Sequence, residues 1–394
     1  MTKTKGYDYI IVGAGIAGMS AAETIASQPG RPTILLINNE PRLPYKRTKI
    51  NKNIEKGFTT NEFALKNQDW FAENNIDLLE HHSTGLNTKE KTIHAGDQSF
   101  TYHKLLLATG SRPRSIGCDA WDNMVLNVRT ASQVEAILQT MQEAHHYFII
   151  GGGAEGIETA EQLVKAGKQV TLVDRNKYLM HNFLPIDMGE RVKNTLSKNG
   201  ILVINPTEIK AIRGGQSLCI DLSDETITAD VIISCIGHTP NIELAQNASI
   251  KTNRGIIVDQ WLQTSAPDVF AAGDAAEHPE GKVTGLWHAA EYQGKIAALN
   301  MMGQSTICER RPYRFKTEIF GDFYFAGGII ESGKEIIEQT NNANIKRYIA
   351  RTNNQITGIA SCNETRYAQL FQQALMERWT LEELESAIKK LECE

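Results

Sequence analysis

The sequence predicts an α/β fold in which two parallel-sheet domains are followed by a small C-terminal α+β domain. The length of 394 residues accommodates roughly two to three domains. A glycine-rich motif occurs twice, each time between a β-rich apolar run and a helix-like stretch. The last 85 or so residues change to an alternating, aromatic-rich pattern that differs from the rest of the chain.

The repeat is the most informative of these observations. Tyr9 to Gly18 reads YIIVGAGIAG, and Phe148 to Gly156 reads FIIGGGAEG. In both copies a helix-like stretch follows, and a further β-branched run then ends in an acid, Glu40 in the first copy and Asp174 in the second. This is the strand, turn, helix and strand order of a Rossmann-like dinucleotide-binding domain. A single glycine-rich turn often arises by chance, whereas two such turns, each between a strand and a helix, rarely do.

Each glycine of G-x-G-x-x-G has a physical role. The first permits a tight turn, the second lets backbone N–H groups approach a pyrophosphate, and the third lets the helix and strand pack closely. The helix N-terminus then stabilises the anion, and the acid is expected to bond the ribose. The candidate cofactor-binding residues are Gly13, Gly15, Gly18 and Glu40 in the first copy and Gly151, Gly153, Gly156 and Asp174 in the second.

Three further apolar runs end in glycine. Residues 104–110, KLLLATG, and 230–237, DVIISCIG, are interpreted as strands at which the chain leaves or re-enters a dinucleotide domain. Residues 264–274, TSAPDVFAAGD, end in an acid that is expected to bond a sugar-alcohol chain or a phosphate. The candidate cofactor-binding residues in these runs are Ala108, Thr109, Gly110, Gly237, Gly273 and Asp274.

The end of the chain predicts the small α+β domain. A β-like alternation is followed by a hairpin around Asn353 and Asn354 and by a helical stretch from Tyr367 to Leu391. The expected domains are 1–114, the first part of one dinucleotide domain; 115–236, the second dinucleotide domain; 237–306, the rest of the first; and 307–394, the C-terminal domain.

Composition and charge exclude several classes of protein. Hydrophobic residues make up 41% and charged residues 22%, which are ordinary values for a globular protein. A net charge of -5 provides no overall positive field for nucleic acid or an anionic membrane surface. Apolar runs fall far short of the roughly 20 residues of a membrane helix, and no apolar leader precedes the first glycine motif. We expect a cytoplasmic protein without nucleic-acid or membrane partners.

The ordered motifs resemble a known family. GAGIAG, LPYKR, LLLATGSRPR, GGGAEGIETA, CIGHTPN and SAPDVFAAGD follow the order of the flavoproteins of the pyridine nucleotide–disulfide oxidoreductase superfamily. LPYKRTKINKN and GLWHAAEYQGKIAALNMMG look most like its NADH:rubredoxin and ferredoxin reductase branch. The resemblance implies FAD on the first glycine motif and NADH on the second. It also implies an FAD domain interrupted by the NAD domain and followed by an interface domain.

Cysteine placement separates the branches of this family. The six cysteines are scattered along the sequence. No CxxC or CxxxxC pair indicates a redox disulfide, and no cluster of cysteines and histidines indicates a metal site. Disulfide reductases of the family carry a CxxxxC after the first acid, and peroxidase or oxidase relatives carry a single reactive cysteine there. Residues 41–57 contain neither. The electrons are therefore expected to leave for an external one-electron carrier, a small acidic protein of the rubredoxin or ferredoxin type.

The resemblance also assigns two cations and a carboxylate in place of the cysteines. It puts Arg47 by the FAD, Lys52 by the reactive edge of the flavin ring, and Glu158 beside Lys52 as its counter-charge. Thr48 replaces the proline that the family usually has after the arginine, so the local turn is expected to differ. The alternatives are a solvated surface lysine and an acid that serves only the helix dipole; we favour the functional interpretation of both residues.

Further residues carry two interpretations each. Trp287 matches an aromatic residue near the flavin in relatives, or it belongs to the core. His288 beside it is a candidate proton donor or, as we favour, a structural residue. Arg112 and Arg129 fall where relatives bring guanidinium groups near FAD or the domain junction, and surface salt bridges explain them almost as well. Asp174 favours NADH over NADPH because a carboxylate repels a 2′-phosphate, although Arg175 follows it directly.

The predicted function is an FAD-dependent NADH:electron-carrier oxidoreductase with Lys52 and Glu158 as catalytic residues. Arg310, Arg311, Arg314 and Lys316 form one candidate docking patch for the carrier, and 46–56 forms another; a solvated face is the simpler alternative. Two other functions stay open: an NADH oxidase or nitrite-reductase component, and a non-catalytic sensor that binds FAD and NADH.

Overall fold

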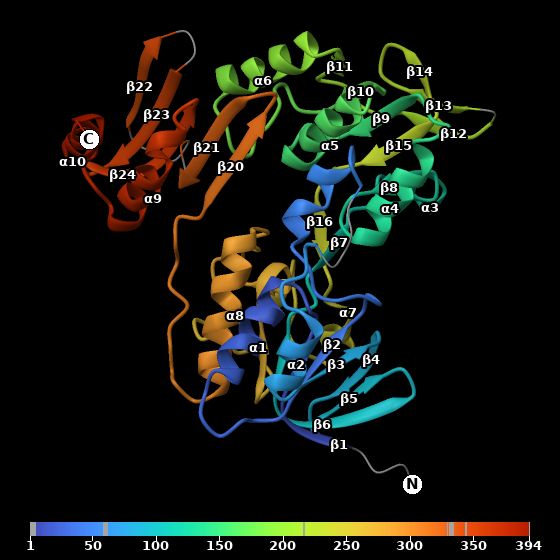
Figure 1. Ribbon diagram of the computed structural model, residues 1–394, viewed down its shortest axis with the longest axis vertical. Helices are drawn as coiled ribbons and strands as arrows, with labels where there is room; N and C mark the ends of the chain where they lie inside the picture. Colours follow the sequence, from blue (N-terminus) through green and yellow to red (C-terminus); the bar gives the residue numbers. More distant parts are fainter. Residues whose placement is uncertain are drawn as a thin grey trace. The chain divides into compact units, whose positions relative to one another are not determined.

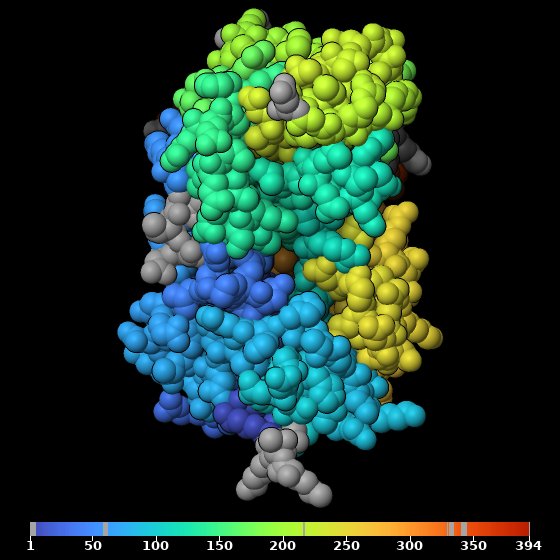
Figure 2. All heavy atoms as spheres, turned by 90° about the vertical axis from the view of Figure 1, so that its right-hand side faces the viewer, coloured from blue at the N-terminus to red at the C-terminus, as the bar shows by residue number. Residues whose placement is uncertain are grey.

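The computed structural model describes residues 5–57, 62–215, 217–328, 330, 335–342 and 345–393, and it divides into two compact units (Figure 1). Unit 1 contains the described residues of 1–50, 58–114 and 238–309. Unit 2 contains those of 51–57, 115–237 and 310–394. In Figure 2 the blue surface of the N-terminal part of unit 1 adjoins the yellow surface that follows residue 238, so distant segments build one body.

Unit 1 is built on a parallel sheet with the order β3-β2-β1-β6. The second half of β6 pairs with β18, and its first half begins an antiparallel extension through β5 and β4. Apolar runs such as Ile34 to Ile37 are buried throughout, as expected of strands that are covered on both faces. The strands of this sheet are β1 (Lys5–Val12), β2 (Ile34–Asn38), β3 (Ile76–Glu80), β4 (Ser83–Asn87), β5 (Thr92–Ala95), β6 (Gln98–Leu107) and β18 (Val269–Ala271). Two short strands of unit 1, β17 (Ile256–Ile257) and β19 (Ala276–Glu277), pair separately with each other.

Helix packing in unit 1 depends on small residues. Helix α8 (Trp287–Met301) packs closely on α1 (Ile16–Ala26), and a Cβ on Gly294 would lie 2.1 Å from the carbonyl oxygen of Ala17. Two short strands, β7 (Ser111–Pro113) and β16 (His238–Pro240), pair antiparallel where the chain leaves and re-enters the unit. The remaining helices of unit 1 are α2 (Gln68–Glu73) and α7 (Glu243–Asn247).

Unit 2 begins with a second parallel sheet, of order β11-β10-β9-β15-β8, and an antiparallel sheet of order β12-β13-β14. The strands are β8 (Val125–Asn127), β9 (His146–Ile150), β10 (Gln169–Val173), β11 (Ile201–Ile204), β12 (Ala211–Arg213), β13 (Leu218–Asp221), β14 (Thr226–Ala229) and β15 (Val231–Ser234). The helices are α3 (Asp119–Asp122), α4 (Ala131–Thr140), α5 (Ala154–Lys165) and α6 (Ile186–Lys198). The helix and strand order matches that of unit 1 around the glycine motif.

The C-terminal part of unit 2 is an antiparallel sheet of order β20-β21-β24-β23-β22 with two helices. Phe325, Ile349 and Phe371 share the core between sheet and helices. The elements are β20 (Arg314–Ile319), β21 (Asp322–Gly328), β22 (Glu335–Asn342), β23 (Ile345–Thr352), β24 (Gln355–Cys362), α9 (Ala368–Glu377) and α10 (Leu381–Cys393). The predicted α/β fold with two Rossmann-like domains and a C-terminal α+β domain is confirmed.

Two local predictions have different outcomes. The hairpin is confirmed, because Asn353 and Asn354 both adopt left-handed conformations between β23 and β24, with φ of 51° and 64°. The prediction of a single helix from Tyr367 to Leu391 is wrong. Helix α9 ends before Arg378, whose φ is 55°, and α10 begins after Thr380. The Thr380 hydroxyl accepts from the Glu383 N–H, and the Glu383 carboxylate accepts from the Thr380 N–H, which is a capping box. Within the described residues no helix is long and apolar enough to cross a membrane.

Candidate functional site

The first and third glycines of both motifs are required by the protein's own backbone. Gly13 and Gly151 have φ of 105° and 111°, in a region that side-chain-bearing residues rarely adopt. A Cβ on Gly13 would lie 2.1 Å from the carbonyl oxygen of Ala108. The third glycines pack on the first, since a Cβ on Gly18 would lie 1.9 Å from the Gly13 oxygen, and one on Gly156 would lie 2.0 Å from the Gly151 oxygen.

The middle glycines, Gly15 and Gly153, have no such reason to be glycine. Their φ angles of -69° and -83° suit any residue, and a Cβ on either would meet no atom of the described chain within 4 Å. Each is the N-cap of a helix, α1 or α5, that has no side-chain cap. Both helices therefore begin with backbone N–H groups that no side chain caps, beside an open glycine position, and this is the arrangement that a pyrophosphate site requires.

The acid that follows the first motif lies in a small polar cluster of unit 1. Glu40 is 8% exposed and accepts hydrogen bonds from the Tyr45 hydroxyl at 2.7 Å and from Arg47 at 2.5 Å. The Arg47 guanidinium also lies 5.2 Å from the centre of the Tyr45 ring. The structure thus brings together Glu40 and Arg47, two residues that were predicted separately. A carboxylate has roughly four acceptor sites, so Glu40 keeps capacity for ribose hydroxyls.

The acid after the second motif supports the glycine turn itself. Asp174 accepts from the backbone N–H of Gly152 at 2.5 Å, and from the backbone and side chain of Asn176 at 2.6 and 2.7 Å. A Cβ on Gly152 would lie 2.4 Å from Leu179 and 3.1 Å from the Asp174 carboxylate. This turn-holding role was not predicted; the extra glycine at 152, where the first motif has Ala14, is the signal for it.

Loops at the end of β6 and β16 are tied together in unit 1. The Thr109 hydroxyl donates to the Asn241 carbonyl at 2.7 Å, and the Asn241 amide donates back to the Thr109 carbonyl at 2.9 Å. Arg112 is exposed and pairs with Glu243 at 2.7 Å, and its place near FAD stays a prediction. Ala108 is buried, whereas Gly110 and Gly237 have φ of 67° and 94°.

The third apolar run ends close to the start of α8. The Asp274 carboxylate accepts from the Ser111 hydroxyl at 3.1 Å, and the Gly273 N–H donates to Gln293 at 2.7 Å. Trp287 is the first residue of α8 and is half-buried, while His288 is exposed. Trp287 therefore does not belong to the closed core of unit 1.

A carboxylate with three donors forms the polar centre of unit 2. Glu158 on α5 pairs with Lys52 at 2.9 Å, and it accepts from Thr317 at 2.8 Å and from Asn51 at 2.9 Å. Asn51 and Lys52 lie in a short 3-10 turn, and Thr317 comes from β20, so three distant segments meet on one side chain. The Lys52 side chain is 42% exposed, while that of Glu158 is 14% exposed. The predicted pair is formed, and its role beside a flavin stays a prediction.

A second carboxylate lies one turn earlier on α5. Burial raises the pKa of Glu155 to about 7; the positive charge of Arg129 opposes this rise and the negative charge of Glu158 adds to it. The structure therefore associates Arg129 with a carboxylate of unit 2. Sequence reasoning missed Glu155, Asn51 and Thr317 as members of this group, because only Glu158 and Lys52 belong to a recognisable motif.

The part of the chain that the structure describes contains neither a disulfide nor a group of residues suited to hold a metal ion. All six cysteines lie in the described part of the chain, and no disulfide joins any two of them. Cys235 is buried, and its burial, with the nearby Glu155 charge, raises the pKa of its thiol well above the usual value. Among the described residues no group of histidines, cysteines and acids could hold a metal ion.

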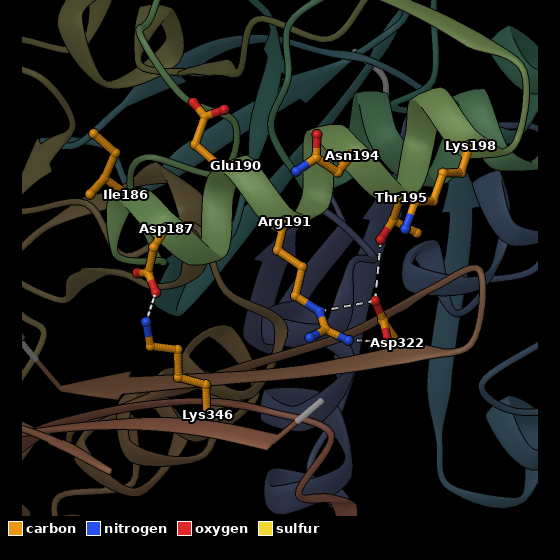
Figure 3. A pocket seen from close by; sticks show the side chains of 9 residues that line it. All are labelled: Ile186, Asp187, Glu190, Arg191, Asn194, Thr195, Lys198, Asp322 and Lys346. Atoms are coloured by element: carbon orange, nitrogen blue, oxygen red, sulfur yellow. Dashed lines mark hydrogen bonds and ion pairs between the residues drawn. The ribbon is translucent and has the colours of Figure 1, made fainter. Parts of the chain in front are cut away.

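A separate cavity of about 690 Å³ lies between α6 and the C-terminal sheet of unit 2 (Figure 3). Both acids and bases line it, and two of the acids pair with two of the bases. Asp187 bonds Lys346, and Arg191 bonds Asp322 at 3.0 and 3.2 Å. The cavity contains no residue that the sequence predicted for a cofactor.

Comparison with known proteins places the chain in a family. Residues 7–294 match the pyridine nucleotide-disulphide oxidoreductases. The ferredoxin reductase component of chlorobenzene dioxygenase from Cupriavidus sp. (strain PS12) is 31% identical, over 83% of this chain and 82% of that protein. Rubredoxin-NAD(+) reductase from Pseudomonas putida is 29% identical, over 86% of this chain and 90% of that protein.

A solved structure extends the likeness to the C-terminal domain. NADH:rubredoxin oxidoreductase from Clostridium acetobutylicum has a TM-score of 0.79 at 25% identity, and the match covers 95% of this chain and 96% of that one. The resemblance that the motifs predicted is confirmed by these matches. The chain belongs to the pyridine nucleotide-disulphide oxidoreductase family.

Proposed function

We propose that this protein is an FAD-dependent NADH:electron-carrier oxidoreductase that delivers single electrons to a rubredoxin or a ferredoxin-type protein. The observation that carries the proposal is the pair of open glycine positions, Gly15 and Gly153, together with the absence of cysteine from 41–57. Family membership makes the chain a flavoprotein oxidoreductase that uses FAD and NADH. FAD, when bound, accepts a hydride as a unit and releases electrons singly.

The chain's own residues have distinct tasks in this proposal. The Gly15 and Gly153 turns bind the two pyrophosphates, and Glu40 and Asp174 orient the riboses. Lys52 supplies a positive charge where negative charge develops during reduction, because Glu158 keeps its ammonium in one place. Thr109, Ser111 and Asp274 hold the loops that border the first cleft. Arg47 works through Glu40, since it bonds that carboxylate directly.

An acidic carrier is the partner that suits the charge distribution. We define the basic cluster as Arg310, Arg311, Arg314 and Lys316, which lead into and lie on β20. Burial and the charge of Arg314 lower the pKa of Lys316, so cations are crowded at this point. A partner of opposite charge relieves that crowding, and such docking weakens at high salt. The relatives named for ferredoxin and rubredoxin support this class of partner.

The decisive experiment is an anaerobic assay of NADH oxidation by the FAD-loaded protein against rubredoxin, ferredoxin and flavorubredoxin acceptors. We expect turnover that requires one of these carriers and falls as salt increases. Rapid NADH oxidation by dioxygen or nitrite without a carrier would show the oxidase or nitrite-reductase alternative. A long-lived charge-transfer complex with negligible turnover would show a sensor.

The Asp174→Ala variant should bind a non-reducing NADH analogue, 1,4,5,6-tetrahydro-NADH, about tenfold more weakly, since it loses a ribose acceptor and the bond that holds Gly152. Its preference for NADH over NADPH should narrow, and its FAD content should stay that of the parent. Calorimetric titration and absorbance at 450 nm measure these quantities. Asp224→Ala, which removes an exposed acid of the same unit, is the control. Unchanged affinity would remove Asp174 from the nucleotide site.

We also propose a cytoplasmic location. The support is chemical: six thiols that form no disulfide suit a reducing compartment.

A further inference from the structure

Strand β20 of the C-terminal sheet is held on the second dinucleotide domain at both of its ends. Near its start the Phe315 ring stacks on Phe183, a residue between β10 and α6, with ring centroids 4.4 Å apart and an interplanar angle of 21°. Directly after the strand, the Phe320 N–H donates to Glu161 of α5 at 3.2 Å. Thr317 lies between these two contacts and is buried. Its side chain therefore has a defined place beside α5, against which β20 packs.

The Thr317 hydroxyl and the Lys52 ammonium share one oxygen of Glu158. Oε1 of this carboxylate lies 2.8 Å from the hydroxyl and 2.9 Å from the ammonium nitrogen. Oε2 accepts from the side-chain amide of Asn51 at 2.9 Å, and Asn51 is buried as well. Each oxygen thus has an uncharged donor at a buried position, and the two donors together determine how the plane of the carboxylate is turned.

Uncharged donors suit this task better than cations would. The Lys52 side chain is long and 42% exposed, and an ion pair at such a site is weak when both partners are free to move. A hydroxyl and an amide orient the carboxylate without neutralising it, so Glu158 remains a full counter-charge for Lys52. A second cation at the place of Thr317 would compete with the lysine for Oε1. The arrangement therefore fixes the partner of the lysine and leaves the lysine's own charge unopposed.

We propose that Thr317 is a positioning residue for the reduction step, because its hydroxyl sets the place of the Lys52 ammonium through Glu158. Asn51 has the same role at the other oxygen. This inference rests on the proposed function, since it assumes that the position of Lys52 matters for flavin reduction. Thr317 keeps its proton throughout and forms no covalent bond. The C-terminal sheet thereby contributes a side chain to the polar centre on which reduction depends.

The kinetic test separates the rate of flavin reduction from the binding of the nucleotide. The FAD-loaded protein is mixed anaerobically in a stopped-flow instrument with a series of NADH concentrations. Thr317→Val, which removes the hydroxyl, should lower the limiting rate about threefold to tenfold, because a displaced charge stabilises the transition state less well. The apparent dissociation constant of NADH should stay within about twofold of the parent value. Thr317→Ser, which restores the hydroxyl, should recover most of the rate.

Two controls show whether the effect passes through Lys52. Adding Thr317→Val to Lys52→Ala should slow reduction no further, since the ammonium that Thr317 positions is then absent. Thr357→Val removes a half-buried hydroxyl from β24 of the same sheet and should leave the parent rate unchanged. A loss as large in the Lys52→Ala protein as in the parent would overturn the inference, because a general disturbance of the sheet does not depend on Lys52.

A measurement without flavin tests the position of the lysine itself. In the full chain before FAD is added, acetylation of Lys52 by acetic anhydride is followed by mass spectrometry, with the exposed Lys56 as the internal reference. Thr317→Val should raise the ratio of labelling at Lys52 to labelling at Lys56 about threefold, because a lysine leaves a loosely held carboxylate more often. Thr317→Ser and Thr357→Val should give the parent ratio.

The outcomes separate this inference from the proposed function. Equal reduction rates and equal labelling in the parent and Thr317→Val proteins would overturn the inference and leave the role of Lys52 intact. If Thr317→Val loses its thermal unfolding transition, Asn51→Ala makes the same test at the other oxygen, with slower reduction and higher labelling expected. A parent protein whose bound FAD is not reduced by NADH would instead refute the proposed function, and the inference with it.

Discussion

Replacing Gly15 with valine should remove FAD from the protein while leaving its fold intact. The φ of -69° at Gly15 is ordinary for valine, and in the part of the chain that the structure describes a Cβ there meets nothing within 4 Å. A valine side chain would occupy the space in which a pyrophosphate approaches the N–H groups of α1. We expect bound FAD, measured by absorbance at 450 nm after purification, to drop from about one per chain to less than about one tenth.

Gly153→Val is the matched variant in the other cleft. It should keep the yellow colour of the protein and lose the binding of tetrahydro-NADH, because the same space opens at the start of α5. Gly18→Ala serves as the opposite control: its Cβ would lie 1.9 Å from a backbone oxygen, so it should unfold the protein rather than merely empty it. Thermal unfolding of the apoproteins separates the two effects. A Gly15→Val protein that retains FAD would end the assignment of the first cleft.

The glycine motifs show what the sequence can predict. Gly13 and Gly151 adopt the positive φ of a turn that is complete within about six residues, so the local pattern contains one sufficient reason for them. Their close approach to the carbonyls of Ala108 and Cys235 is a second reason, which no local pattern contains. The hairpin at Asn353 is predictable for the first of these reasons, because two left-handed residues determine it. The break at Arg378 is also local, and its signal is the Thr380 to Glu383 capping box.

Contacts between distant segments were beyond such reasoning. Thr317 bonds Glu158 across 159 positions of the chain, and Asn51 bonds it across 107. Neither the residue type nor the spacing of Thr317 and Asn51 predicts these hydrogen bonds. A threonine or an asparagine can donate to the Glu158 carboxylate only after β20 and the 3-10 turn have packed against α5. The same holds for the pKa of Glu155, which depends on burial by surrounding elements. The sequence could identify Glu158 and Lys52 only through the resemblance to relatives.

Substituting Lys52 with alanine should slow the reduction of bound FAD by NADH on the order of tenfold to a hundredfold. A fixed cation that stabilises developing negative charge contributes on the order of a hundredfold or more in a dry site, and the 42% exposure of the Lys52 side chain reduces that value. Anaerobic stopped-flow mixing, followed by flavin absorbance, measures the rate. Lys56→Ala, which removes an exposed lysine four positions later, should reduce at the parent rate.

Glu158→Gln tests whether the pair acts as a unit. A neutral amide still accepts a hydrogen bond, but it leaves the Lys52 ammonium without its counter-charge and frees the side chain to move. The rate should fall in this variant too, and the double variant should be little slower than Lys52→Ala alone, since the two changes remove one interaction. Additive losses would mean that Glu158 acts independently of Lys52. Identical rates in the parent and Lys52→Ala proteins would make the ion pair a structural contact of α5, because a charge that takes part in reduction cannot be deleted without changing its rate.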